Sequence, residues 1–529
     1  MIEDDLYCFS LGRMRSFQGR KCILTYSGII GGVKLVKLWR KYGHLWAALA
    51  GIAMIAGGTF LAIRWAKGDR PRFGNKGPAV TGTGLLVASS DPKGAQVFIN
   101  GKLTSATDDT LNLTPGEYLV EIKKDGFISW KKNLQIKAEL VVQTDARLFP
   151  SVPNLTPLTF TGIKEPVSSS DGQKIVYKVD SASTEVKNGL WVLELTDHNL
   201  PIARTSEPRQ IARNTSQYNF MDANLLWSTD NSQVLAYWTE ENIKYKSQNL
   251  KYKNGKQQPT AQTTEKEIVI KQAILLDASR MNDVNNLTDA TTRLPVTLAQ
   301  WYQDLDLKEQ KRLAELPEFM QKLVNESATG VYFSPDERRV MYTASKEMVI
   351  PDELITDLPS ESTQNEQRSL AAGKIYVYDI KEDRNYLMEG AALSVEEQTS
   401  NTESIEKDNY WVERFNGNAS MSAETSKPNV SLPPIPNTLV VPMLDKLKIR
   451  YSPIFTQTAQ WFPTSAHLIT TYTDKIVVTE YDGQNSATVY AGPFNSSFVY
   501  PWPNGNRLVI MTNFSNSTAA DNLYALNLK

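Results

Sequence analysis

The sequence predicts a mainly β protein with one transmembrane helix and two β domains after it. Residues 45–63 pass nineteen positions without a charged side chain. Downstream, short runs of alternating apolar and polar residues are separated by Gly, Pro, Asp and Asn, as in antiparallel strands joined by tight turns. From residue 152 onward, five stretches repeat one turn-and-strand pattern, which indicates a repetitive β architecture.

The segment 45–63 has the length of a membrane-spanning helix. At about 1.5 Å per residue it covers roughly 29 Å, close to the ~30 Å hydrocarbon core of a bilayer. A signal peptide would have a shorter apolar region nearer the start, and a buried core helix would be shorter or carry a polar face. Lys and Arg flank the segment almost equally, and a small excess within residues 1–44 favours a cytoplasmic tail. We therefore expect a single-pass protein of the cell membrane with an extracytoplasmic C-terminal body.

Overall charge and cysteine content limit the partners and the redox demands of this body. The net charge is −1 over 529 residues, so no overall field favours nucleic acid as a partner. Both cysteines, Cys8 and Cys22, precede the apolar segment. The body therefore contains no disulfide, and its stability must come from packing.

A Gly- and Pro-rich linker at residues 64–84 is expected to separate the helix from a small β domain. Residues 85–149 predict an antiparallel β-sandwich, because short alternating runs are separated by turn dipeptides. Asn100-Gly101 favours a type I′ hairpin turn, since both residues tolerate positive φ.

This β domain resembles the PEGA domain. The resemblance rests on Pro92-Lys93-Gly94-Ala95, on Asn100-Gly101, on the run from Leu113 to Tyr118, and on Asp125-Gly126-Phe127 with Trp130. Lys93 stands where the family has the glutamate that gives it its name. The resemblance implies a bacterial or archaeal extracytoplasmic β-sandwich at the cell envelope, with no catalytic residue to transfer to this chain.

Residues 152–529 predict a β-propeller of about five to seven blades with helical and disordered insertions. Each copy of the repeat has an aliphatic residue four positions after its central turn residue and a polar residue one position earlier. A tight turn fixes where the next strand places its first inward side chain, which explains this spacing. The chain ends before the last blade has an outer strand, so we expect residues 158–161 to supply it and close the ring. The central turn residues are Asp171, Asp230, Asp336, Thr464 and Asn504.

The repeats resemble the WD40-like propellers of the TolB type. Ser334-Pro335-Asp336 and Asp171-Gly172 keep most of the family's turn before a hydrophobic strand, whereas Thr464 and Asn504 depart from it. The resemblance implies a propeller architecture and a binding role, and it implies no reaction.

Four insertions interrupt the predicted propeller. Residues 298–326 have helical spacing with a break near Pro317, and they either pack on the rim of the propeller or form a docking lid for a partner. The other three are polar or rich in Ser, Thr, Asn and Pro, and we expect loops with partial disorder there. They span residues 242–265, 351–372 and 391–442.

Aromatic side chains are the best candidates for ligand binding. Trp227, Phe333 and Trp461 occupy one position of the repeat, and Trp502 lies one residue later. These side chains either pack between neighbouring blades or line the central entrance and stack on a sugar or a peptide. Trp411, within the insertion 391–442, is an independent candidate.

No motif indicates catalysis, a metal site or a cofactor. The histidines His44, His198 and His467 have no neighbour at metal-ligand spacing, and His467 is expected to be solvated or structural. Nucleophile-elbow, zincin, P-loop and Rossmann glycine motifs do not occur in the sequence. We therefore expect no enzyme, no metal and no cofactor, and paired carboxylates for sugar hydrolysis stay an alternative because Asp and Glu are plentiful.

The leading functional hypothesis is a membrane-anchored extracytoplasmic binding protein. Its β-propeller would recognise a cell-envelope polymer, such as wall glycan, or an envelope protein. The first alternative is a structural scaffold that docks its partners through the insertions, and the second is a carboxylate-dependent hydrolase. The sequence leaves the ligand, the number of blades and the oligomeric state open.

Overall fold

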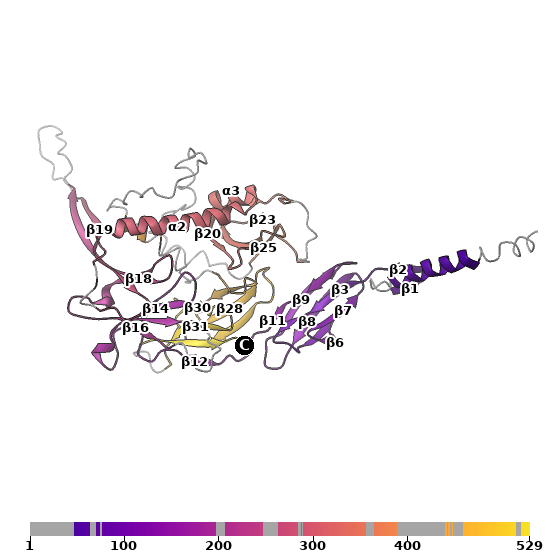
Figure 1. The fold of residues 1–529 in the computed structure, drawn as a ribbon, viewed down its shortest axis with the longest axis horizontal. Coiled ribbons are helices and arrows are strands. Elements are labelled where there is room, and N and C mark those ends of the chain that lie inside the picture. The colour runs from indigo at the N-terminus through magenta and orange to yellow at the C-terminus, as the bar shows by residue number, and fades with distance from the viewer. Residues whose placement is uncertain are drawn as a thin grey trace, which may run out of the picture. The chain divides into compact units, whose positions relative to one another are not determined.

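The structure is a computed structural model in which the placement of most, but not all, residues is described (Figure 1). The described part divides into two compact units, Met1–Gly82 and Thr83–Lys529. The predicted tail 1–44, Trp411, and most of the insertions 242–265 and 391–442 lie outside the described residues. The described residues are 47–63, 70–74, 77–196, 207–246, 263–283, 287, 289–355, 364–388, 440–441, 443–444, 447, 459–514 and 520–529.

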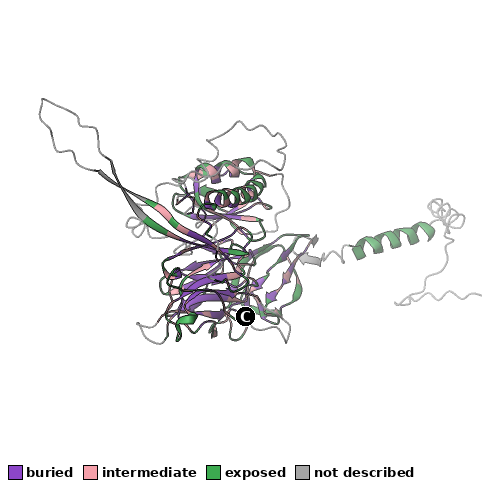
Figure 2. Cartoon of the chain, turned by 60° about the vertical axis from the view of Figure 1, so that its left-hand side comes forward, coloured by how far each residue is buried: buried purple, intermediate pink, exposed green. Residues whose placement is uncertain are grey.

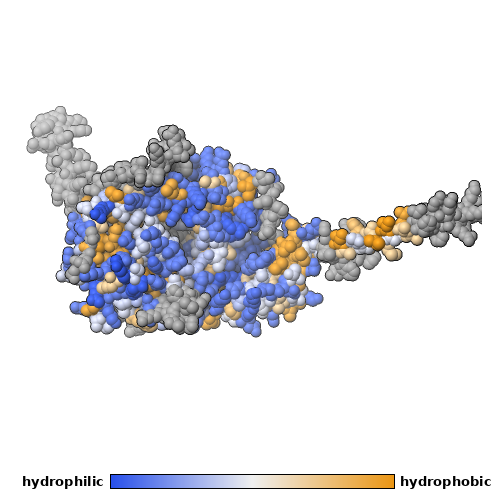
Figure 3. Space-filling model, in the orientation of Figure 1, coloured by the Kyte–Doolittle hydropathy of each residue, from blue (hydrophilic) through white to orange (hydrophobic). Residues whose placement is uncertain are grey.

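The first unit contains a helix at residues 47–63 and a short hairpin. Every helical residue is exposed, and apolar side chains follow the helix along its length (Figures 2 and 3). The hairpin pairs β1 (Arg70–Gly74) with β2 (Gly77–Thr81), so the predicted linker contains strands. A search of the described residues finds no helix that combines the length and the apolar character needed to cross a membrane. The predicted span, of which Leu45 and Trp46 lie outside the described residues, is therefore not confirmed.

The second unit begins with a small β-sandwich, as predicted, but the sandwich is not purely antiparallel, because β10 pairs with β3 and β11 pairs with β4 in parallel. One sheet has the strand order β6-β5-β8-β9, and a second has the order β10-β3-β7. Their inward residues share one core, which includes Leu86, Val97, Val120 and Trp130. The strands are β3 (Gly84–Ala88), β4 (Ser90–Asp91), β5 (Gln96–Ile99), β6 (Lys102–Ala106), β7 (Asp109–Leu113), β8 (Gly116–Lys123), β9 (Trp130–Ile136), β10 (Val141–Gln143) and β11 (Ala146–Arg147). We call residues 84–147 the sandwich.

The described remainder of the second unit contains one two-stranded sheet and five larger antiparallel sheets, and we call the larger ones sheets A to E. Sheets A to D each use strands that follow one another along the chain. Sheet A has β13 (Lys164–Ser168), β14 (Lys174–Val179), β15 (Gly189–Glu194) and β16 (Arg209–Arg213); sheet B has β17 (Asn224–Trp227), β18 (Gln233–Lys246) and β19 (Thr263–Asp277). Sheet C has β20 (Ala328–Phe333), β21 (Arg339–Ala344), β24 (Ile375–Asp379) and β25 (Arg384–Leu387); sheet D has β26 (Gln460–Trp461), β27 (His467–Thr471), β28 (Lys475–Glu480) and β29 (Ala487–Ala491).

Sheet E combines the two ends of this region. Its strands from the C-terminal end are β30 (Val499–Pro501), β31 (Arg507–Thr512) and β32 (Asn522–Asn527). Its outer strand is β12 (Leu155–Pro157), which pairs with β32 in the register Leu155 to Leu526. An upstream strand does supply the outer strand of this sheet, but it begins three residues before the predicted 158–161. Within the predicted range, Leu158 still donates a backbone hydrogen bond to Leu523 just beyond the end of β12.

The turn between the first two strands of each sheet is the repeated element that the sequence predicted. The residue after each central turn residue has positive φ in all five copies. In three copies a serine hydroxyl bonds the turn aspartate two residues later and accepts the N–H of the residue that begins the next strand. These bonds fix the turn and so fix the register of the strand that leaves it. The positive-φ residues are Gly172, Asn231, Glu337, Ser465 and Gly505.

Neighbouring sheets bury their faces against one another through shared apolar cores. Sheets A and B share one apolar core, A and E a second, E and D a third, and D and C a fourth. Sheets B and C meet helices instead. Sheet B packs against Leu298 and Trp301 of α2 (Leu294–Ala314), and sheet C packs against Met320 and Leu323 of α3 (Glu318–Glu326).

We call α2, α3 and the helical residues Val440, Leu444 and Leu447 the helical wedge, because together they fill the place between sheets B and C. Figure 1 shows α2 and α3 beside β19 and β20. The predicted break near Pro317 is confirmed, since that residue lies between the two helices. Of the two interpretations of residues 298–326, packing against the sheets is the one that the structure shows.

Candidate functional site

Two of the five predicted binding aromatics lie in the core. Trp227 is 0% exposed in the core between sheets A and B, and its indole N–H donates to the carbonyl of Val167 in the neighbouring sheet at 3.0 Å. Trp502 is 1% exposed between sheets A and E, with the guanidinium of Arg507 over its ring. A buried indole offers no face on which a sugar or a peptide can stack, so these two residues act in packing.

Phe333 and Trp461 are half-buried and also take part in packing. The indole of Trp461 in sheet D donates to the carbonyl of Tyr332 in sheet C at 2.9 Å, the same kind of bond that Trp227 makes. Phe333 packs against the core that sheet C shares with α3. The structure therefore spreads the four described aromatics over three inter-sheet contacts and one contact between a sheet and a helix, and does not gather them into one binding site. Trp411 lies outside the described residues.

Long cations bridge adjacent sheets at the repeated turns. Lys174 of sheet A donates to the carbonyl of Asn231 in sheet B at 3.0 Å, and Arg339 of sheet C donates to the carbonyl of Ser465 in sheet D at 3.2 Å. Both occupy the polar position of the repeat, whose role the sequence left open. The corresponding carbonyl in sheet E, that of Gly505, accepts from Arg147 of the sandwich.

His467 occupies the polar position of sheet D but is buried, at 4% exposed. Its ring lies edge-on to Phe149 at 5.8 Å and to Phe462 at 6.0 Å, and Arg147 stacks on both phenylalanines. Burial, with the nearby charge of Arg147, lowers the pKa of His467 to about 3. The imidazole is therefore neutral in the folded protein and structural, as one of the two expectations had it.

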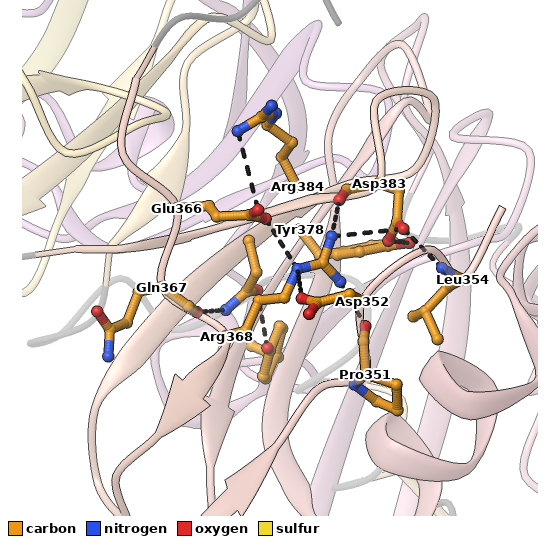
Figure 4. Close-up of polar contacts among 11 residues, drawn as sticks. Pro351, Asp352, Leu354, Glu366, Gln367, Arg368, Tyr378, Asp383 and Arg384 are labelled. Atoms are coloured by element: carbon orange, nitrogen blue, oxygen red, sulfur yellow. Dashed lines mark hydrogen bonds and ion pairs between the residues drawn. The ribbon is translucent and has the colours of Figure 1, made fainter. Parts of the chain in front are cut away.

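A polar network surrounds Arg368, beside sheet C (Figure 4). We call residues 350–355 and 364–370 the strap. The strap follows β22 (Met348–Val349) and ends with β23 (Ser369–Leu370), and these two strands pair with each other next to the network. The Arg368 guanidinium pairs with Glu366 at 3.0 Å, Asp352 at 3.3 Å and Asp383 at 3.4 Å. Burial alone would lower the pKa of Arg368, but Asp383 and Glu366 raise it, so the cation is held firmly.

Asp383 ties the strap to sheet C. Its carboxylate accepts from the hydroxyl of Tyr378 at 2.8 Å and from the backbone N–H of Leu354 at 2.7 Å. Burial and this bond raise the pKa of Tyr378, so the phenol remains a donor at neutral pH. Each buried charge in this network is paired with an opposite charge or a hydrogen bond. The network therefore holds the backbone of the strap against sheet C. Among the described residues no group of three His, Cys, Asp or Glu side chains is placed to hold a metal.

Comparisons with known proteins agree with part of the sequence prediction. Residues 83–151 match the PEGA domain, and no curated protein matches the chain. A TolB structure from Agrobacterium tumefaciens is 10% identical, with 69% of this chain and 78% of that chain covered and a TM-score of 0.18. The tricorn protease is 8% identical, with 77% and 29% covered and a TM-score of 0.13. TM-scores this low carry no argument about the arrangement of the sheets.

Replacing Arg368 by methionine is expected to loosen the strap. The change leaves the buried Asp383 without its cation, a loss of about 3 kcal/mol by comparison with other broken buried pairs. The strap should then be cut faster by a protease under native conditions, and the free energy of unfolding should fall. Lys381→Met, an exposed change in the adjoining turn, is the control and should leave both measurements unchanged. Equal cleavage rates in the two variants would contradict the role of Arg368.

Acid is expected to destabilise the fold through His467. Its folded pKa lies below the ordinary 6.5, so the unfolded chain binds a proton that the folded chain excludes, and stability is lost as pH falls below 6.5. The loss by pH 4.5 is about 2–3 kcal/mol. His467→Gln should flatten the pH dependence of chemical unfolding between pH 6.5 and 4.5. An unchanged slope would show that the histidine is not kept neutral.

Proposed function

We propose that the chain is a membrane-anchored binding protein of the cell envelope, with its body outside the cytoplasm. The observation that carries this proposal is the helix at residues 47–63, whose large apolar side chains are all exposed. Burying them in lipid would stabilise the protein by roughly 10 kcal/mol. They are Leu49, Ile52, Met54, Ile55, Phe60, Leu61 and Ile63, with exposed fractions from 53% to 80%.

The second support is the order of the domains. A helix, a PEGA domain and a large β body follow one another in the chain. A PEGA domain between a lipid-seeking helix and a repetitive β body suits a protein that displays the body near a membrane surface. We further propose that sheets A to E form a five-bladed β-propeller, with the helical wedge in the place of another blade. The shared cores of neighbouring sheets and the outer strand β12 support this architecture.

The docking surface that we favour is the helical wedge, which is the scaffold alternative predicted from the sequence. Because Trp227 and Trp502 are buried, a ligand cannot stack on their side chains. In contrast, Val296 and Leu307 are the large apolar side chains of α2 that are exposed, at 40% and 59%. A protein of the envelope is therefore a better candidate partner than a wall glycan.

Membrane attachment is expected to depend on the apolar helix. The full-length protein, expressed in a bacterium, should sediment with membranes and resist carbonate extraction. Ile52→Arg with Ile55→Arg should release a large fraction into the soluble phase, because each arginine costs about 2.5–3.5 kcal/mol at the centre of a span. Protease added to spheroplasts should digest the body. A soluble wild-type protein, or a body that is protected in intact spheroplasts, would contradict the proposal.

Partner binding is expected to depend on the wedge surface. Val296→Asp with Leu307→Asp changes exposed positions only, whereas deleting the helices would uncover the faces of sheets B and C. The double variant should recover at least ten-fold less of any cross-linked envelope protein than the wild type. Val186→Asp, at a 58% exposed position of the connection between β14 and β15, is the matched control. Equal recovery of the partner by both variants would show that the docking surface does not include Val296 and Leu307.

A further inference from the structure

The sandwich and the sheets meet through an apolar contact, through a polar contact at β9, and through single contacts elsewhere. Arg147 of the sandwich donates to the carbonyl of Gly505 and lies over the ring of Phe462. Asp91 pairs with Lys529 at 3.3 Å, and the carbonyl of Asn133 accepts from Gln364 at 3.0 Å.

The apolar contact consists of Phe149, a member of the core between sheets D and E, and of Ile128, which packs against that core. The backbone N–H of Ile128 donates to the carbonyl of Phe149 at 2.8 Å, so the two residues form one joint. We call them the pivot.

The polar contact is made by β9, the edge strand of the sandwich. The ammonium of Lys132 lies 2.7 Å from a carboxylate oxygen of Glu480 and also contacts Asp482. The side chains of these three residues are 12%, 9% and 1% exposed. The indole N–H of Trp130 donates to the other oxygen of Glu480, and the backbone N–H of Lys131 donates to Asn485 at 2.7 Å.

Charge holds the polar contact together. Burial alone would lower the pKa of Lys132, but the two carboxylates raise it. Burial raises the pKa of Asp482 although Lys132 opposes this, so the single cation only partly offsets the cost of two buried carboxylates. The charged and titratable groups that surround the three residues are Arg147 of β11, His467 of β27, and Tyr481, whose ring lies against Arg339 of β21.

The hydrophobic cores on the two sides are separate. The core of the sandwich is built only from residues between 86 and 148, and the cores of the sheets contain no side chain of β9. Separation of β9 from sheet D would therefore uncover polar and charged atoms, which water solvates well. The cores on both sides would stay buried, so an opened state is compatible with two intact folds.

We propose that Lys132, Glu480 and Asp482 form an electrostatic latch that holds the sandwich in one orientation against sheet D. When the latch is released, the sandwich turns about the pivot while both parts remain folded. Removing the cation releases it, because two buried carboxylates then lack a counter-charge. Removing both carboxylate charges has the same effect, since the ammonium is then the unpaired charge. A variant with all three charges removed leaves no unpaired charge that must be hydrated, so the remaining contacts, such as the bond from Arg147 to the carbonyl of Gly505, close it again.

The test measures the distance between the sandwich and the wedge in the full-length protein in detergent. Cys8 and Cys22 are replaced by serine, and spin labels are attached to cysteines introduced at Lys102 and Glu318, both exposed. Pulsed electron resonance should give one narrow distance distribution for this labelled protein. Lys132→Met should make a broad, displaced distribution the major one, and so should Glu480→Gln with Asp482→Asn.

Two controls separate a latch from a general loss of structure. Lys131→Met removes the neighbouring cation of β9, which is 54% exposed and lies 3.9 Å from Glu121 within the sandwich, and should keep the narrow distribution. Combining Lys132→Met, Glu480→Gln and Asp482→Asn should restore the narrow distribution. Circular dichroism checks the fold of every variant. A narrow distribution in the folded Lys132→Met protein would overturn the proposal, as would a broad one in the triple variant or in Lys131→Met.

Discussion

Lateral packing of sheets that are apolar on both faces is the constraint on which this structure depends. The central strands β24 and β27 are buried at every residue, so neither face of sheet C or sheet D can be left to water (Figure 2). A sheet of this kind needs a neighbour on each side, and so does each neighbour in turn. A row of such sheets needs a cover for the face left open at each end. Shared cores join the sheets in the order C, D, E, A and B, and the helical wedge covers the faces of sheets B and C at the two ends.

The chain completes this arrangement in two different ways. Within sheet E, β12 pairs with β32, so residues separated by more than 360 positions complete one sheet, as Leu155 and Leu526 illustrate. Between sheets B and C, the closure is helical. The wedge draws α2 and α3 from the connection between B and C, and Val440, Leu444 and Leu447 from the connection between C and D. Residues from two connections therefore pack together between sheets B and C, and the connection that leads to sheet D contacts sheet B.

Local features of this architecture could be read from the sequence, and long-range ones could not. The turns around Asp171, Asp230 and Asp336 were predictable because a serine, an aspartate and a positive-φ residue act within six positions. The packing of Trp227 was one of two possibilities, since a tryptophan at the end of a strand has the same local pattern whether it faces a channel or a neighbour. Lys132 and Glu480 lie 348 positions apart, and nothing in either segment indicates the other. Arg147 was missed for the same reason: its partner is a backbone carbonyl, which any residue supplies.

Side chains that pack between the sheets are not available to form a functional surface. At the repeated aromatic positions Trp227 and Trp461 bond to a neighbouring sheet, and at the repeated polar positions Lys174 and Arg339 do the same, so the fold uses these residues. A distinctive function must then draw on residues outside the repeat. The strap around Arg368 and the wedge come from insertions, and the interface with the sandwich joins Lys132 of another domain to Glu480, which ends the repeat strand β28.

The wedge shows how an insertion can occupy a structural place and still be free to bind. Packed sheets lie about 10 Å apart, and packed helices lie about 8–10 Å apart, so a helical layer fits a gap of the width that a sheet would fill. A sheet placed there would bury two apolar faces and expose only its outer edge. A helix buries one stripe on each neighbour and leaves a third side to water, as α2 does with Leu298 and Trp301 inside and Leu307 outside. Replacing a sheet by helices therefore adds a side surface, and a partner could use that surface while sheets B and C stay covered.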